Sequence, residues 1–362
     1  MTTVGFLGGG QLARMMALAG IPLGIASSFL DPAADACAGV AGELIIDAYD
    51  SPEGLDRLAA SADVVTFEFE SVPASSAERL ASRVAVHPPP RALEVAQDRL
   101  FEKRLFEQLG IEVTGFLAID SQQKLDAAGR AGVLKTRRLG YDGKGQRVLE
   151  GAGDAEGAFD DLGGVPLLLE DLVAFDRELS AIAVRGRNGE VRCYPLVENH
   201  HADGILRVTH APAPGLTPEL QALGERYVTA VLEELEYVGV LGLELFQAGD
   251  RLLANEMAPR VHNSGHWTIE SAQTSQFENH MRAVCGLPLG DVSARGESTM
   301  VNLIGAVPDA DAVLAVDGAH LHLYGKAPRP GRKVGHVTVT SGGDWRRIAE
   351  LAGAPAGTTA AR

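Results

Sequence analysis

Two glutamates on either side of a predicted tight turn are the residues best suited to chemistry. Glu244 lies in one short apolar run and Glu256 in the next, and a three-residue turn around Asp250 predicts an antiparallel hairpin with facing carboxylates. Facing like charges destabilise a sheet, and burial raises that cost. A divalent cation would remove the conflict. Oxygen ligands, with Asn255 adding one more, indicate Mg²⁺; structural salt bridges are the alternative.

A glycine-rich segment follows a lysine farther upstream. Lys135 ends an apolar run, and Lys144 lies between Gly143 and Gly145. Glycines let backbone amides approach phosphate oxygens, and lysines neutralise the phosphate charge. The segment 140–146 therefore predicts a flexible lid over a triphosphate, although it lacks the Walker pattern Gly-x-x-x-x-Gly-Lys-Ser/Thr. A plain hairpin rich in Gly and Lys is the alternative.

Nitrogen donors are dense in the turn after the second glutamate. This turn holds Arg260, His262, Asn263 and His266. Their density indicates an anion pocket, and a zinc site is disfavoured because His-Glu-x-x-His spacing is absent. A second basic group lies in the C-terminal part and comprises Lys326, Arg329, Arg332 and Lys333. It predicts a phosphate-binding patch, with solvated surface charge as the alternative.

The first ninety residues carry two weaker signals. A Gly-x-Gly-x-x-Ala motif from residue 8 follows an apolar run and opens a helix, and Asp31 ends the next run. This fits a dinucleotide fingerprint, but any α/β domain can begin with such a glycine turn. Glu68 and Glu70 lie at the end of a predicted strand, Val64–Phe69, where open sheets bind ligands. A solvated edge strand is the alternative.

The elements that must position these residues follow a mixed α/β pattern. Short apolar runs alternate with helical stretches over residues 1–90, which predicts a parallel sheet with crossover helices. The run Pro88-Pro89-Pro90 cannot continue a helix or a central strand, so we place the first domain boundary there. From about residue 111 on, short apolar runs separated by turn residues predict mainly strands and turns.

Composition restricts the class of protein. The chain has 362 residues, 46% of them hydrophobic, and a formal net charge of −16, which disfavours a nucleic-acid or anionic-membrane binder. Three cysteines far apart in the sequence indicate a reducing compartment without disulfides. The start lacks a basic region before an apolar run, and no stretch reaches membrane-spanning length. We therefore expect a soluble, cytoplasmic protein.

Taken in order, the motifs closely resemble those of the N5-carboxyaminoimidazole ribonucleotide synthetases, a family of ATP-grasp ligases in purine biosynthesis. The matching segments are 8–15, 66–70, 97–99, 135 with 140–146, 194–206, 255–267 and 329–336. The most specific is Asn-Glu-Met-Ala-Pro-Arg-Val-His-Asn-Ser-Gly-His-Trp at 255–267. The resemblance extends from residue 4 to about residue 340. It departs at Ser271 and Gln273, but no charged motif residue is missing.

The resemblance implies a fold and a reaction. The fold would be a mixed α/β, three-domain ATP-grasp fold. It would comprise a Rossmann-like domain at 1–90, an ATP-grasp domain at 91–292 with a lid at about 112–172, and a small β-rich domain at 293–362. The reaction would join 5-aminoimidazole ribonucleotide to bicarbonate with ATP, through carboxyphosphate, giving the N5-carboxyamino product, ADP and phosphate. The resemblance also implies a homodimer.

It further implies a role for each matching residue. ATP would be contacted by Arg99, Lys135, Gly140, Tyr141, Asp142, Gly143, Lys144, Gly145, Gln146, Glu170, Asp171, Leu172, Val173, Glu178, His201, Asn255 and Glu256. Glu244 and Glu256 would hold Mg²⁺. The ribonucleotide would be held by Gln11, Glu70, Lys326, Arg332 and Lys333. For catalysis of this reaction we ourselves expect Arg260, His262, Asn263 and Lys135, with Arg260 as the candidate that orients bicarbonate.

Three alternatives remain at this level. An ATP-grasp ligase for another acid, such as a formate-using transformylase or a biotin-dependent carboxylase, fits the donor-rich turn and basic tail less well. A nicotinamide-dependent oxidoreductase leaves the Lys135 loop and the carboxylate hairpin unexplained. A catalytically silent nucleotide-binding regulator is disfavoured by the intact set of charged residues.

Overall fold

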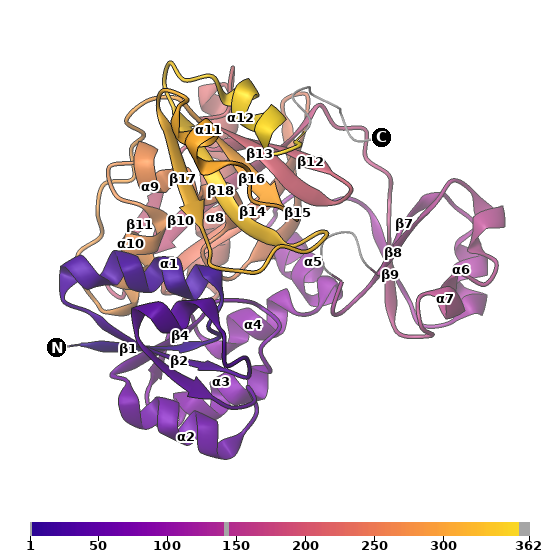
Figure 1. The fold of residues 1–362 in the computed structure, drawn as a ribbon. Helices are drawn as coiled ribbons and strands as arrows, with labels where there is room; N and C mark the ends of the chain where they lie inside the picture. Colours follow the sequence, from indigo (N-terminus) through magenta and orange to yellow (C-terminus); the bar gives the residue numbers. More distant parts are fainter. Residues whose placement is uncertain (1, 141–144, 355–362) are drawn as a thin grey trace.

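A parallel sheet forms the N-terminal part of the computed structural model, which describes residues 2–140 and 145–354 (Figure 1). Its strand order is β3-β2-β1-β4-β5, and neighbouring strands all pair in parallel. The strands are β1 (Thr3–Leu7), β2 (Ala26–Asp31), β3 (Glu43–Ile46), β4 (Val64–Phe67) and β5 (Ala85–Val86). The helices are α1 (Gln11–Gly20), α2 (Pro52–Ser61), α3 (Ala74–Ala81) and α4 (Pro90–Ala96). The predicted Rossmann-like parallel sheet is confirmed, although β4 ends at Phe67, two residues before the predicted end.

An antiparallel sheet of nine strands forms the body of the described chain. Its order is β15-β14-β10-β12-β13-β16-β18-β17, with β11 paired to β10. The strands are β10 (Arg177–Arg185), β11 (Val191–Cys193), β12 (Val197–Ala202), β13 (Ile205–Ala211), β14 (Gly239–Ala248), β15 (Arg251–Ala258), β16 (Ser298–Ile304), β17 (Ala319–Leu323) and β18 (Lys333–Thr340). Because β16–β18 continue this sheet, it crosses the boundary expected at 292/293. The division into 1–90, 91–292 and 293–362 stays a prediction.

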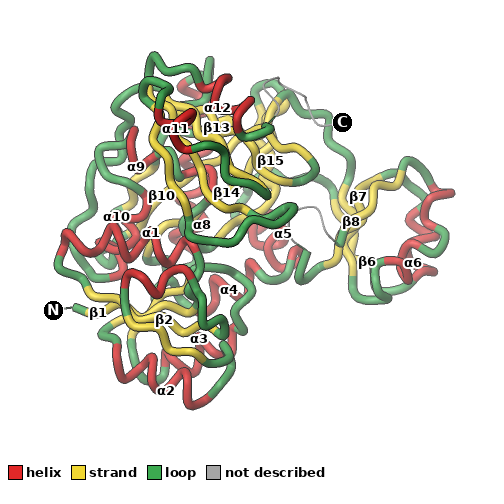
Figure 2. The backbone as a smooth tube through the Cα atoms, in the orientation of Figure 1, coloured by secondary structure: helices red, strands yellow, loops and turns green. Residues whose placement is uncertain are grey.

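A small sheet projects from the body (Figures 1 and 2). Its antiparallel order is β6-β9-β7-β8. It comprises β6 (Phe116–Ile119), β7 (Gly132–Thr136), β8 (Gln146–Leu149) and β9 (Leu167–Glu170), with α6 (Gln122–Ala128) and α7 (Ala158–Asp161) beside them. The chain enters it through the non-helical segment 109–115 and leaves through 171–176 (Figure 2). We call this unit the lid sheet, because its residues fall within the lid expected at about 112–172; its closure over a nucleotide stays a prediction.

Helices pack against the body and join it to the N-terminal sheet. They are α5 (Arg99–Gln108), α8 (Pro218–Glu234), α9 (Thr268–Ser271), α10 (Gln276–Val284), α11 (Ala310–Leu314) and α12 (Trp345–Leu351). The start of α8 follows from its sequence, because Thr217 Oγ1 accepts a hydrogen bond from the Leu220 amide at 3.3 Å and Pro218 takes the first helical position. One buried apolar cluster includes Phe6 of β1 and Trp267 of the body, so the two parts share a core.

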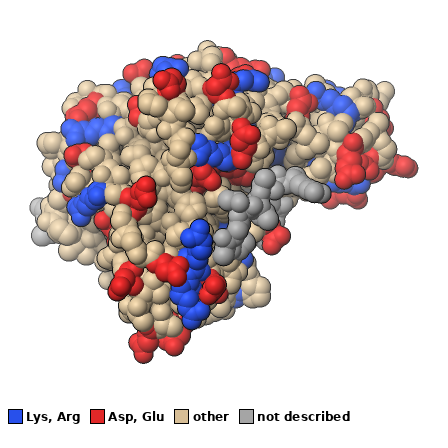
Figure 3. Space-filling model, turned by 90° about the horizontal axis from the view of Figure 1, so that it is seen from above, with Lys and Arg blue, Asp and Glu red and all other residues tan. Residues whose placement is uncertain are grey.

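The charged surface, the cysteines and the helix lengths complete the description of the fold. Acidic and basic side chains are interspersed on the face seen in Figure 3. Cys37, Cys193 and Cys285 are free thiols. Within residues 2–140 and 145–354, no helix has the length and apolar character needed to span a membrane.

Candidate active site

The carboxylate hairpin exists, but its geometry differs from the prediction. Ala248 pairs with Arg251, so the turn has two residues and not three. Such a turn alone would set Glu244 opposite Asn255. The register then shifts, because Leu245 pairs with Ala254 whereas Leu243 pairs with Met257. This β-bulge places both Asn255 and Glu256 opposite Glu244.

Each of the two glutamates has a nitrogen partner within the protein. Glu256 Oε2 lies 2.8 Å from Arg99 Nη1, and Glu244 Oε1 lies 3.2 Å from His262 Nε2. Burial raises the pKa of Glu244, but the His262 imidazole outweighs burial and the pKa falls below its ordinary value. These contacts agree with the salt-bridge alternative for the free protein, and the assignment of Mg²⁺ to this pair stays a prediction.

The hairpin nevertheless offers oxygen ligands that suit a hard cation. The Asn255 Oδ1 atom is buried and has no hydrogen-bond partner. Together with Glu244 and Glu256 it forms an oxygen-only donor set, which Mg²⁺ prefers. Among the described residues, no group of three His, Cys, Asp or Glu side chains is arranged to hold a metal. A magnesium ion here would therefore need further oxygens from a nucleotide or from water.

Lys135 belongs to a buried charge network at the end of the lid sheet. Glu170 Oε2 lies 3.1 Å from Lys135 Nζ and 3.4 Å from Lys103 Nζ. Burial raises the pKa of Glu170, but the charges of Lys103, Lys135 and Arg99 outweigh it and lower the pKa. The structure thus brings together Arg99, Lys135 and Glu170, three of the residues expected to contact ATP.

The segment between the lid and the body carries the next residues of that set. The Asp171 side chain pairs with Arg130 at 2.8 Å, and its amide donates to the Gly115 carbonyl at 2.8 Å. Leu172 is exposed, and Val173 lies beside it in the segment that leaves the lid. Backbone groups of such a connector are available to read the edge of an adenine.

Glu178 and His201 form an adjacent pair on neighbouring strands of the body. His201 Nδ1 lies 2.5 Å from Glu178 Oε2. Burial lowers the pKa of His201, but Glu178 outweighs it, Glu244 and Glu256 add to the effect, and the pKa rises above its ordinary value. His201 therefore lies within electrostatic reach of the hairpin carboxylates.

The glycine-rich loop is described only at its ends. Tyr141, Asp142, Gly143 and Lys144 lie outside the described residues. Gly140 precedes them, and Gln146 opens β8. Gly145 has φ +70°, and a Cβ there would lie 2.6 Å from the Thr136 hydroxyl oxygen, so this position requires glycine.

The donor-rich turn links the hairpin to the N-terminal domain. Arg260 Nε donates to Glu70 Oε2 at 2.5 Å. The side-chain oxygen and nitrogen of Asn263 are both buried without a hydrogen-bond partner. Unpartnered buried amides are costly, so this pair of atoms is suited to a polar ligand. His262 lies between these two residues and contacts Glu244.

The predicted ribonucleotide residues separate into two groups. Lys326 and Arg332 line a cavity of about 300 Å³ together with Gly9, Gly10 and Asp35. The Lys326 ammonium contacts Gln11 Oε1. Glu70 instead pairs with Arg260, and the charge of Lys333 helps to lower the pKa of Glu244, which places Lys333 on the hairpin side.

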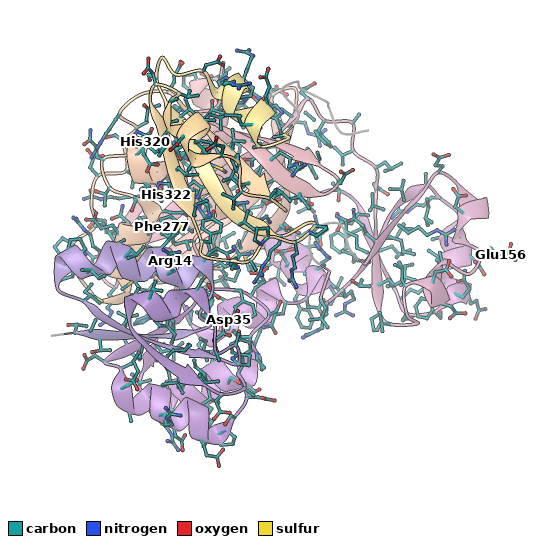
Figure 4. All side chains as sticks on the ribbon, in the orientation of Figure 1. Arg14, Asp35, Glu156, Phe277, His320 and His322 are labelled. Atoms are coloured by element: carbon teal, nitrogen blue, oxygen red, sulfur yellow. The ribbon has the colours of Figure 1, made fainter. Side chains whose placement is uncertain are left out.

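This cavity lies between the N-terminal domain and the C-terminal strands. Arg14 Nη1 donates to the Leu323 carbonyl at 3.0 Å, which ties α1 to the end of β17. Figure 4 labels Arg14 and Asp35, both on the side of the N-terminal domain that faces the C-terminal strands. The cavity therefore joins residues about 300 positions apart in the chain.

The glycine turn of the N-terminal sheet does not offer free amides to a dinucleotide. Glu68 leaves the strand and accepts hydrogen bonds from the Gly10 amide at 2.5 Å and the Ala13 amide at 3.0 Å. The Gly9 amide donates to Asp31 at 2.8 Å. The chain's own carboxylates thus occupy the start of α1, which argues against the oxidoreductase alternative.

Sequence reasoning missed a pair of charged residues close to the hairpin. Glu102 and Lys103 on α5 are both buried, and both contact the backbone of β15. The available signal was their helical spacing from the apolar residues Leu105 and Phe106, which lie on the same buried face of α5. Charged residues on such a face are seldom buried without a specific partner.

Three family matches cover the chain in order. Residues 1–97 match the ribonucleotide synthetase preATP-grasp domain, and residues 104–277 match the ATP-grasp domain. Residues 298–347 match the phosphoribosylaminoimidazole carboxylase C-terminal domain.

Relatives of this chain share most of its length. An N5-carboxyaminoimidazole ribonucleotide synthase from Pseudomonas aeruginosa is 55% identical over 340 residues, covering 93% of this chain and 94% of that protein. The crystal structure of N5-carboxyaminoimidazole ribonucleotide synthetase from Thermus thermophilus is 53% identical with a TM-score of 0.91, covering 96% of this chain and 98% of that one. An Aspergillus clavatus synthase in complex with ADP and 5-aminoimidazole ribonucleotide is 31% identical with a TM-score of 0.86, covering 94% of each chain.

Proposed function

The chain belongs to the N5-carboxyaminoimidazole ribonucleotide synthase family, and from this membership we propose that it carboxylates 5-aminoimidazole ribonucleotide with ATP. The expected ATP-grasp ligase and its three-part ATP-grasp fold are confirmed by the family matches. The reaction belongs to purine biosynthesis and yields the N5-carboxyamino ribonucleotide, ADP and phosphate.

One observation carries the proposal. β15 runs from Glu256 directly into the turn whose Arg260 contacts Glu70 of the N-terminal domain at 2.5 Å. Glu256, which is suited to a metal–nucleotide complex, and Arg260, which is suited to an anion, are therefore only four positions apart in the chain. A ligase needs this arrangement because phosphoryl donor and acceptor must be held in contact.

The ATP side would use the network around Lys135. Arg99 and Lys135 supply positive charge for the phosphates, and Glu178 offers a carboxylate to ribose hydroxyls. Glu244, Glu256 and Asn255 would hold Mg²⁺, which neutralises charge on the transferring phosphoryl group. Arg99 and His262, which now contact these carboxylates, would then be available to oxygens of the nucleotide.

The carbon source we propose is bicarbonate. Its carbon is a poor electrophile, and attack of a bicarbonate oxygen on the γ-phosphorus of ATP converts a hydroxide leaving group into phosphate. Arg260, His262 and Asn263 would orient the anion through charge and through the two unpartnered amide atoms of Asn263. Exclusion of water by the lid would protect the resulting carboxyphosphate.

The ribonucleotide would extend from this turn into the cavity between domains. Lys326 and Arg332 provide two cations there for its phosphate, with Gln11 beside Lys326. Glu70 and Lys333 lie nearer the reacting groups. The 5-amino nitrogen would then attack the carboxyl carbon, the bond from carbon to the phosphate oxygen would break, and the departing phosphate would take up the proton that the nitrogen loses.

Assembly and location are further parts of the proposal. We expect a homodimer, which sedimentation or light scattering would detect as twice the chain mass. We expect a cytoplasmic protein, in keeping with three free thiols and a small-molecule substrate set.

The test is ADP release measured with each substrate omitted in turn. We expect rapid ADP release only when ATP, bicarbonate and 5-aminoimidazole ribonucleotide are all present. ADP release that responds to formate or to biotin in place of these substrates would favour another ATP-grasp ligase. ATP-independent change in nicotinamide absorbance would favour the oxidoreductase and contradict the proposal.

A further inference from the structure

The strand that carries Asn255 and Glu256 has an irregular edge. β15 is the last strand of the nine-stranded sheet as described, so in that sheet only β14 pairs with it. Between the pairs Leu245–Ala254 and Leu243–Met257, β15 contains one residue more than β14. A bulge of this kind interrupts the ladder of backbone hydrogen bonds. Other groups must therefore fix its conformation.

Two adjacent side chains of α5 contact the residues on either side of the bulge. Glu102 Oε1 accepts a hydrogen bond from the Met257 amide at 2.6 Å. Lys103 Nζ donates to the Ala254 carbonyl at 3.2 Å. These contacts enclose Asn255 and Glu256 between them. Ala254 and Met257 are three positions apart. In a regular strand the backbone groups of two such residues point to opposite edges, so contacts with both from one side occur only because of the bulge.

The pair is costly to bury and is not explained by packing. Glu102 is 2% exposed and Lys103 is 1% exposed. Burial raises the pKa of Glu102 and lowers that of Lys103, as expected for charged groups moved out of water. Apolar side chains would fill the same space at a lower free-energy cost.

Lys103 also connects the bulge to the phosphate-binding lysine. Its Nζ lies 3.4 Å from Glu170 Oε2, and the same oxygen lies 3.1 Å from Lys135 Nζ. A single turn of α5 thus reaches both the metal-ligand strand and the partner of Lys135. No substrate contact by Glu102 or Lys103 is needed for this effect.

We propose that Glu102 and Lys103 are positioning residues that hold the β15 bulge so that Asn255 and Glu256 face Glu244. The proposal rests on the proposed function, because it assigns these residues to the magnesium–nucleotide site. For Glu102 the relevant property is the oxygen that accepts the Met257 amide, and not the negative charge. Matched substitutions can separate those two properties.

The experiment compares Glu102→Gln with Glu102→Asp. Glutamine keeps the reach and the acceptor oxygen but removes the charge, whereas aspartate keeps the charge but is one methylene too short. Calorimetric titration with ADP, in Mg²⁺ and in EDTA, gives the factor by which Mg²⁺ tightens ADP binding. Glu107→Gln and Glu107→Asp, at an exposed position of the same helix, are the controls. Thermal melting of each variant reports any general loss of stability.

We expect Glu102→Asp to reduce the Mg²⁺-dependent factor about tenfold, as for other residues that orient metal ligands. Glu102→Gln should retain most of that factor, and both controls should match the wild type. A purely structural role would lower the melting temperature of Glu102→Asp without changing the factor, and would overturn the proposal. Loss in Glu102→Gln equal to that in Glu102→Asp would also overturn it.

The wild-type measurement separates this inference from the function on which it rests. If Mg²⁺ does not tighten ADP binding to the wild-type protein, the proposed magnesium site is wrong, and the positioning role is overturned with it. If the wild type shows the effect and Glu102→Asp retains it, only the positioning role is overturned.

Discussion

The Glu256 carboxylate has two partners in this account: an arginine in the structure and a metal ion in the proposed reaction. In the structure it pairs with Arg99, and in the proposed reaction it holds Mg²⁺. Exchange between these partners requires that Glu256 remain partly accessible, and its side chain is 41% exposed. Glu244 is more enclosed, and its Oε1 lies 3.2 Å from His262 Nε2. Both glutamates thus have a partner within the protein, and Glu256 is the more accessible of the two.

Substitution Glu256→Gln should lower turnover by about 100-fold or more, because one metal-ligand charge is lost at the transferring phosphoryl group. Steady-state ADP release in saturating Mg²⁺ measures this. Glu234→Gln is a matched control, since Glu234 pairs with Arg91 at 2.9 Å and is 42% exposed. Wild-type turnover in Glu256→Gln would show that the metal assignment is wrong.

Substitution Arg332→Ala should raise the KM for the ribonucleotide about tenfold, the usual cost of losing a charged hydrogen bond. The KM for ATP should change much less, because Arg332 lines the cavity between domains and not the Lys135 network. Arg347→Ala, which alters an exposed arginine of α12, is the control. An unchanged ribonucleotide KM would remove Arg332 from the site.

At the scale of elements, the sequence predicts the hairpin but not its bulge. Alternating apolar residues and a turn at Gly249-Asp250 suffice to predict two facing strands. The predicted three-residue turn is wrong, however, and Glu256 lies opposite Glu244 only because of the bulge. The extra residue in β15 lies beside contacts from Glu102 and Lys103 of α5, and no local sequence pattern reveals such contacts. For the same reason the predicted strand Val64–Phe69 is too long: Glu68 is drawn to the amides of α1 and ends β4 early.

The joint between lid and body is another element-scale feature. Asp98 caps α5 and pairs with Arg137 at 2.6 Å and Arg138 at 3.2 Å, just beyond β7. Burial raises the pKa of Asp98, but these arginines outweigh burial and lower it. Asp98 thus ties the end of the Lys135 strand to the helix that begins with Arg99.

Substitution Asp98→Asn should raise the KM for ATP severalfold, because asparagine still caps the helix but loses the charge that holds both arginines. The ribonucleotide KM should change less. Asp120→Asn, at an exposed lid position that pairs with Lys124, is the control. Equal increases in both KM values would instead indicate a general loss of structure.

At the scale of the whole molecule, the site depends on contacts between distant parts of the chain. The cavity walls come from residues near position 10 and near position 326, and Glu70 meets Arg260. Sequence patterns reveal the glycine turn near position 10 and the basic group near position 326. They do not reveal that the two parts of the chain pack so that both groups line one cavity. The separation of Lys333 from Lys326, toward the hairpin, likewise follows only from three-dimensional packing.

His280 helps to hold the N-terminal sheet against the body. Its Nδ1 accepts from the Val240 amide at 3.1 Å, so its protonated Nε2 donates to the Thr66 hydroxyl at 2.9 Å. Burial lowers the pKa of His280 from 6.5 to about 3. Below pH 6.5 the unfolded chain therefore binds a proton that the folded chain does not, and stability is lost as the pH falls.

The free energy of unfolding should fall less steeply with acid in His280→Gln than in the wild type. The difference in slope should be up to about 1.4 kcal/mol per pH unit between pH 6 and pH 4. Differential scanning calorimetry at several pH values measures it as a smaller fall in melting temperature than in the wild type. His320→Gln, at an exposed position of β17, should leave the dependence unchanged. Identical acid dependence in His280→Gln and the wild type would contradict the neutral, buried role of His280.

The transfer of a bicarbonate oxygen to phosphate tests the central claim most directly. Bicarbonate labelled with ¹⁸O is supplied with ATP and 5-aminoimidazole ribonucleotide, and the phosphate formed at early times is analysed by mass spectrometry. Phosphorylation of bicarbonate predicts one labelled oxygen in each phosphate, because the bridging oxygen of carboxyphosphate leaves with phosphorus. Phosphate that carries no label while the carboxylated ribonucleotide accumulates would contradict it.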